Sequence, residues 1–182
     1  DGTDDRAITG IGFRPDLVII KDDTAIGDEG VIFKTSAMPG ELTLVLAETD
    51  PNLTENHIQS LDADGFTVGN DEDVNAQNIM YFWIAVTGSD CSATGTFCVG
   101  TYVGNGIGFQ PDLVTTKRAA AQLGIWKSSV MPGAVSNYFS NTAQLASGGI
   151  ESLTASGFTL GTHDTANASA SIYYYFAFKE VA

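Results

Sequence analysis

The chain contains one sequence pattern twice, and this duplication restricts the possible folds more than any other feature. IGFRPDLVIIK begins at Ile11, and IGFQPDLVTTK begins at Ile107 (107 − 11 = 96). Two more blocks follow in the same order, because FKTSAMPG returns as WKSSVMPG and IQSLDADGFTVG returns as IESLTASGFTLG. Three matching blocks in one order indicate that the chain consists of two copies of one structural unit.

The blocks divide the 182 residues into two repeats of similar length. We assign residues 1–88 to repeat 1, residues 89–98 to a linker and residues 99–182 to repeat 2. A chain of this length can bury a core as one domain or as two small ones. The repeats therefore form either two domains or one pseudo-symmetric unit.

Each block has the pattern of turns followed by strands. The MPG motifs and the ADGF and ASGF sequences are typical of chain reversals, and helical periodicity is weak throughout. The sequence therefore predicts an all-β fold of two tandem β-sandwich repeats of the jelly-roll type. A glycine and a Pro-Asp pair in each first block should form a structural turn before a strand: Gly12, Pro15, Asp16, Gly108, Pro111 and Asp112.

The last strand of each repeat is apolar or aromatic on both faces. A half-exposed strand would carry polar residues on one side, so we expect coverage by packing between the repeats or against a neighbouring subunit. A sugar-stacking surface is the alternative. It would use Tyr81, Trp83, Tyr173 and Tyr175.

Two cysteines, Cys91 and Cys98, lie between the repeats. Their spacing suits a disulfide that closes a short loop, although a pair of free thiols would fit the same spacing. Such a bridge would contribute roughly 2–3 kcal/mol to stability by the loss of chain entropy in the unfolded state. A disulfide would also indicate an oxidising compartment outside the cytosol.

The charge of the chain limits its partners. The sequence has 22 acidic residues and 8 basic ones, which gives a formal net charge of −14. This charge repels nucleic acid and anionic lipid, and no apolar run reaches the ~20 residues that span a bilayer. We therefore expect neither a nucleic-acid partner nor membrane insertion.

Residues for catalysis are not apparent. The acidic position that both repeats share is Asp16 and Asp112, and its place after a proline favours a turn role. His57 and His163 do not align with each other, and neither lies in a known catalytic motif, so we expect surface or loop histidines. The sequence favours a non-enzymatic protein.

Calcium is the one cofactor that the sequence suggests, and otherwise we expect none. Asp71, Asp73 and Asn75 offer oxygen atoms at alternate positions, as at the start of a calcium-binding loop. The central glycine and the closing glutamate of an EF-hand are missing. A solvated hairpin loop is the alternative interpretation.

The combined pattern GFxPDLVxxK, K-x-S-x-MPG, S-L-x-A-x-GFT-[VL]-G and a terminal aromatic strand resembles a repeat domain of bacteriophage tail, fibre and other virion-associated proteins. The resemblance covers nearly the whole chain. It implies a structural or receptor-facing β domain with no assigned catalytic residues. We therefore expect a structural subunit of a virion or extracellular assembly that binds other copies of itself or other structural proteins, or alternatively a glycan-binding adhesin.

The repeats differ from that family pattern in one place. Repeat 2 has the lead-in strand TFCVGTYVGNG before its first block, whereas repeat 1 has DGTDDRAITG and leaves no room for such a strand. We expect that either upstream residues or another subunit completes this edge of repeat 1.

Overall fold

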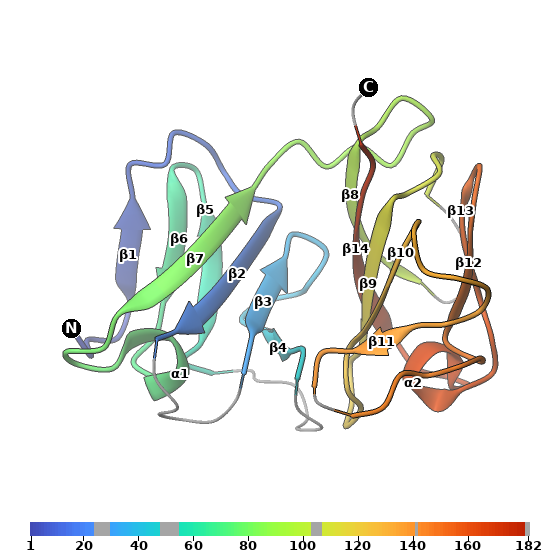
Figure 1. Cartoon of the computed structure of the whole chain (residues 1–182). Helices are drawn as coiled ribbons and strands as arrows, with labels where there is room; N and C mark the ends of the chain where they lie inside the picture. Colours follow the sequence, from blue (N-terminus) through green and yellow to red (C-terminus); the bar gives the residue numbers. More distant parts are fainter. Residues whose placement is uncertain (24–29, 48–54, 103–106, 141, 181–182) are drawn as a thin grey trace.

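The computed structural model describes residues 1–23, 30–47, 55–102, 107–140 and 142–180, and these residues are almost entirely β (Figure 1). Antiparallel strands build four sheets. Two four-residue helices, α1 (Glu72–Asn75) and α2 (Asp164–Asn167), precede the last strand of each repeat. The predicted all-β sandwich fold is confirmed. In the described part of the chain, neither helix has the length or apolarity to cross a membrane.

Repeat 1 is a sandwich of two sheets. The first has the order β4-β3-β2-β7, with β2 (Leu17–Asp22), β3 (Ile32–Thr35), β4 (Leu44–Val45) and β7 (Tyr81–Val86). The second has the order β1-β6-β5, with β1 (Arg6–Thr9), β5 (Ile58–Asp62) and β6 (Gly65–Val68). The core of repeat 1 includes Val18 and Ile20 from the first sheet and Phe66 and Val68 from the second.

Repeat 2 has the same arrangement with one strand more in its large sheet. This sheet has the order β11-β10-β9-β14-β8, with β8 (Phe97–Tyr102), β9 (Leu113–Arg118), β10 (Ile125–Ser128), β11 (Asn137–Tyr138) and β14 (Tyr173–Phe178). The small sheet pairs β12 (Ile150–Thr154) with β13 (Gly157–Leu160). β8 therefore begins within the segment that we assigned to the linker.

A third apolar cluster joins the two repeats. The large sheets face each other in the middle of the molecule (Figure 1). Leu17 and Phe33 of repeat 1 belong to the same buried cluster as Val99 and Phe176 of repeat 2. The rings of Phe33 and Phe176 meet edge to face, with centroids 5.6 Å apart. Each large sheet is thus apolar on both faces because one face lines its own core and the other lines the interface.

A buried lysine explains the K-x-S-x-MPG motif. The Lys34 ammonium donates to the carbonyl oxygens of Gly40 at 2.6 Å and Leu42 at 2.8 Å. Lys127 of repeat 2 holds its loop in the same way, through Gly133 at 2.7 Å and Val135 at 2.9 Å. Desolvation by burial lowers the pKa of Lys34 to about 8, against an opposing effect of the Glu41 charge. In each repeat the lysine thus satisfies two carbonyl groups of the loop that follows its strand.

We expect Lys34→Met to lower the free energy of unfolding by about 2–4 kcal/mol, because two carbonyl groups lose their charged donor. Urea denaturation of the purified chain measures this change. Lys179→Met is the matched control, since Lys179 is exposed and should tolerate the change within about 0.5 kcal/mol. Equal stability of the two variants would contradict a structural role for Lys34.

Candidate functional site

The last strands of the two repeats differ in their backbone pairing. β14 lies between β9 and β8 and pairs with both over its whole length, from Tyr173 to Phe178. β7 pairs with β2 over the equivalent residues and ends its sheet. Among the described residues, no strand pairs with the other edge of β7. Repeat 1 therefore has an open sheet edge where repeat 2 has a covered one.

The cause is the segment that precedes the first block. In repeat 2 this segment contains β8, which adds to the large sheet beside β14. In repeat 1 the residues aligned with β8 are 1–6, and those before Arg6 form no strand. β1 begins at Arg6, the position of Tyr102, and pairs with β6 of the small sheet. The strand ahead of the first block of repeat 1, β1, thus belongs to the small sheet. Among the described residues nothing takes the place of β8 beside β7, so what completes this edge stays a prediction.

The missing neighbour leaves apolar side chains of repeat 1 in solvent. Met80 is 59% exposed, Phe82 61%, Trp83 43% and Ile84 60%. We call these four residues the β7 surface. In β14, Tyr174 and Phe176 at the positions of Phe82 and Ile84 are each only 4% exposed, and Tyr175 at the position of Trp83 is 5% exposed. Packing within the chain thus covers β14 and leaves these residues of β7 exposed, so coverage of β7 by a neighbouring subunit stays a prediction.

The four aromatic residues of the proposed sugar-stacking surface do not share a surface. Tyr173 and Tyr175 are buried in the core of repeat 2. Tyr81 is half-buried, and its hydroxyl accepts from the Ala76 amide at 2.7 Å and donates to the carbonyl of Glu72. This bridge links the two ends of α1. Only Trp83 of the four is exposed, so the predicted platform is not assembled.

A cavity of about 160 Å³ lies beside the open edge. Phe66 of β6, Tyr81 and Trp83 of β7 and Val74 of α1 line it, and Arg6 of β1 closes one side. The Trp83 ring meets the Phe66 ring edge to face, with centroids 5.5 Å apart. The cavity therefore has aromatic walls and is adjacent to unpaired backbone.

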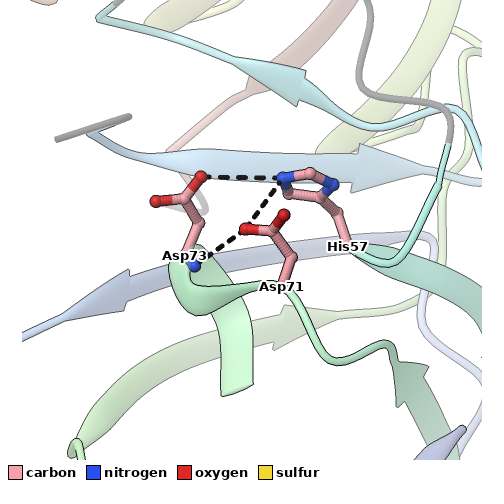
Figure 2. Close-up of side chains that lie close together, drawn as sticks. All are labelled: His57, Asp71 and Asp73. Atoms are coloured by element: carbon pink, nitrogen blue, oxygen red, sulfur yellow. Dashed lines mark hydrogen bonds and ion pairs between the residues drawn. The ribbon is translucent and has the colours of Figure 1, made fainter. Parts of the chain in front are cut away.

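A second cluster of functional side chains lies near the start of α1 (Figure 2). The Nε2 atom of His57 is 3.4 Å from Oδ1 of Asp71 and 3.6 Å from Oδ2 of Asp73. Asp71 is the N-cap of α1, and its Oδ1 accepts from the Asp73 amide at 3.0 Å. Nδ1 of His57 contacts the carbonyl oxygen of Glu55 at 2.6 Å. His57 is 7% exposed and lies in the bend before β5, so it is a loop histidine, as one of the two expected alternatives had it, but a buried one.

His163 has a different role from His57. It is exposed and caps α2, where its Nδ1 accepts from the Thr165 amide at 3.2 Å. It takes the position of Asp71, and Gly149 and Thr165 take the positions of His57 and Asp73. All three members of the cluster thus differ between the repeats. That joint replacement is the sequence signal that links His57 to two residues distant from it in the chain.

The three residues predicted to bind calcium do not form one group of ligands. Asp71 and Asp73 lie together, but Asn75 is buried and engaged elsewhere: its Oδ1 accepts from Arg6 at 2.8 Å, and its Nδ2 donates to Gly69 at 3.0 Å. Asn167 makes the same bond to Gly161, so this asparagine has a structural role in both repeats. Calcium takes six to eight oxygen ligands. One imidazole nitrogen and two carboxylate oxygens are instead a donor set suited to zinc.

The conserved aspartates of the first blocks hold the chain at the predicted turns. Asp16 accepts from the Ser36 hydroxyl at 2.9 Å and from the Ser89 amide at 3.0 Å. Asp112 accepts from the Glu180 amide at 2.9 Å. These bonds tie the start of β2 and of β9 to the segments that follow β7 and β14. Pro15 and Pro111 precede the aspartates, two residues before each strand begins.

Cys91 and Cys98 form a disulfide, with Cα atoms 5.0 Å apart. Its loop covers the outer edge of β8, because the Asp90 amide donates to the Phe97 carbonyl at 2.8 Å and the Val99 amide donates to Ser89 Oγ at 3.0 Å. A Cβ atom on Gly108 would lie 2.8 Å from the Cys91 oxygen, so this loop requires glycine there. Gly12, by contrast, has a φ of 83°, which favours glycine for conformational reasons.

Comparison with known protein families finds one matching family. Residues 1–181 match the family described as "Domain of unknown function (DUF7483)". The chain belongs to this family. The match covers both repeats. Comparison with curated proteins and with solved structures found no match.

The His57 cluster predicts a pH-dependent stability. Burial lowers the pKa of His57, but Asp73, the Glu55 carbonyl and the charge of Asp71 outweigh it and raise the pKa above its ordinary 6.5. The protonated histidine therefore stabilises the fold fully below about pH 6.5, and this contribution is lost as the pH rises through the raised pKa.

We expect His57→Gln to remove that part of the pH dependence, measured as the free energy of unfolding in urea from pH 5 to pH 9. Val130→Ser is the control, because it replaces an 88% exposed, non-titrating side chain, and it should leave the pH profile of the parent chain unchanged. A His57→Gln profile parallel to that of the parent would show that the cluster does not bind the proton more tightly in the folded state.

Proposed function

We propose that the chain is a non-enzymatic structural subunit of a virion or extracellular assembly and that it joins its neighbours through the β7 surface. The observation that carries this proposal is the open edge of β7 with exposed apolar residues on both faces. Soluble proteins generally shield such edges, because unpaired strands recruit other chains. Exposed apolar patches of this kind also mark protein interfaces.

The second repeat supports this use of the surface. Tyr174 and Phe176 of β14 are buried by packing against the large sheet of repeat 1. Phe82 and Ile84 are at the same positions of the repeat and remain exposed. The same module thus provides, in one copy, an example of how this strand packs when a neighbour covers it.

Charge and redox chemistry fit an assembly outside the cytosol. A disulfide joins Cys91 to Cys98, and such bonds persist in oxidising compartments. The net charge of −14 produces repulsion between free subunits, which disfavours unspecific aggregation. The resemblance of the two repeats to domains of phage tails and fibres points in the same direction. The glycan-binding alternative has less support, because Trp83 is the one exposed ring among the four residues predicted to stack on sugars.

We expect the purified chain to self-associate with increasing concentration and the double variant Phe82→Ser/Ile84→Ser to remain monomeric. The substitutions replace solvent-exposed side chains, so the melting temperature should not fall. Light scattering measures the mass, and negative-stain microscopy shows whether rings, fibres or lattices form.

Val130→Ser is the matched control, because Val130 is 88% exposed in repeat 2 and lies outside the β7 surface. This variant should associate like the parent chain. A parent chain that stays monomeric at every concentration, or a double variant that associates equally well, would contradict assembly of copies through the β7 surface.

A further inference from the structure

We propose that the open edge of β7 binds one extended strand of a neighbouring polypeptide and that a tyrosine of this strand fills the cavity beside β7. This inference rests on the proposed function and names the kind of partner that the surface takes. Its argument comes from repeat 2, which contains such a strand within the same chain.

In repeat 2 the strand is β8, and its tyrosine is Tyr102. The Tyr102 ring stacks on Tyr173 with centroids 5.0 Å apart and meets Phe158 edge to face at 5.8 Å. The Tyr175 ring lies 6.2 Å away. The Tyr102 hydroxyl donates to the carbonyl oxygen of Ala166 at 2.9 Å. Three aromatic rings and one carbonyl group therefore hold this side chain, which is 4% exposed.

All four of these groups have counterparts around the cavity of repeat 1. Tyr81, Phe66 and Trp83 are at the positions of Tyr173, Phe158 and Tyr175, and Val74 is at the position of Ala166. All four line the cavity. Repeat 1 therefore has counterparts of the three rings around Tyr102, and the residue at the sequence position of Tyr102, Arg6, lines the cavity while its guanidinium donates to Asn75.

The walls of the cavity already have the geometry of the filled site. The Phe66 and Trp83 rings meet at 5.5 Å and 75°, and the equivalent Phe158 and Tyr175 rings meet at 5.7 Å and 73°. A side chain can thus enter without rearrangement of these rings. The volume of about 160 Å³ is far below the roughly 300–1,000 Å³ of small-molecule pockets, which favours a single side chain as the occupant.

The backbone of β7 is oriented to pair with the added strand. The carbonyl groups of Met80 and Val86 accept from the β2 side, through Asp23 at 3.0 Å and Asp16 at 2.7 Å. Because hydrogen-bonding direction alternates along a strand, Tyr81, Trp83 and Ala85 direct their backbone groups to the open edge. An antiparallel strand in the register of β8 would place its tyrosine opposite Tyr81, as Tyr102 lies opposite Tyr173.

The occupant is a segment of another polypeptide and not β8 of a second copy. β8 is already paired with its own β14, and the loop of Cys91 and Cys98 covers part of its outer edge. The chain carries a net charge of −14, so charge complementarity favours a neutral or basic segment. The added strand would also bring apolar residues beside Ile84 and Val86, where β8 places Val99 and Phe97.

A synthetic peptide with the sequence of residues 96–102 and Cys98→Ser tests this inference. Trp126→Phe in the full chain leaves Trp83 as the one tryptophan, since the sequence has two. We expect saturable binding with a change in Trp83 fluorescence. Hydrogen exchange should show slower exchange at the amides of Trp83 and Ala85 when the peptide is bound.

Two comparisons test the cavity itself. A peptide that also carries Tyr102→Ala should bind about tenfold more weakly or worse, because it leaves the cavity empty. Trp83→Ala in the chain should lower the affinity for the parent peptide to a similar extent, as measured by calorimetry. Val130→Ser should leave that affinity unchanged. Equal affinity of the two peptides would overturn the assignment of the cavity. No added protection of Trp83 and Ala85 at high peptide concentration would overturn strand addition.

The result is separable from the test of the proposed function. Peptide binding by a chain that never self-associates supports the strand site and contradicts assembly between copies. Self-association that requires Phe82 and Ile84, without peptide-dependent protection of the β7 edge, supports assembly by face-to-face packing and overturns strand addition.

Discussion

The two repeats differ in whether the backbone of the last strand is hydrogen-bonded on both edges. β14 is bonded on both edges because β9 and β8 lie on either side of it. β7 has the same place in the repeat and a partner on one side, β2. Unpaired amide and carbonyl groups at an edge remain in water or recruit a further strand. The two strands also differ in the cover of their side chains, because Tyr174 and Phe176 pack against the large sheet of repeat 1 while Phe82 and Ile84 remain exposed.

Equivalent side chains consequently have different roles in the two repeats. Tyr175 is a core residue, whereas Trp83 at the same position lies at the surface beside a cavity. Tyr81 and Tyr173 keep a common role, because each hydroxyl bridges the ends of the short helix before its strand. The shared tyrosine is thus structural, whereas the position of Trp83 differs in burial between the repeats.

Local features were largely predictable from the sequence, and clusters built from distant residues were not. The lysine and glycine of the K-x-S-x-MPG motif interact across six residues, as Lys34 does with Gly40. The turn role of Asp16 likewise follows from its place after Pro15. His57 meets Asp71 and Asp73 because the bend before β5 is bonded to the segment before α1, where the Asp71 amide donates to the Asn56 carbonyl at 3.1 Å. Sequence spacing does not predict that contact. The failure of the calcium ligand set at Asn75 has the same origin, since tertiary bonds occupy that side chain.

The amino-acid sequence by itself determined the duplication, the all-β class and the aromatic character of both last strands, because these depend on local pattern and on comparison between copies. Tertiary structure decided how each last strand is paired, since β14 lies between β9 and β8 whereas β7 pairs with β2. Backbone groups are chemically alike in every strand, so local sequence does not encode the choice of partner strand. That choice depends on how the flanking side chains pack, and it is the reason that one repeat is closed and the other has an open edge.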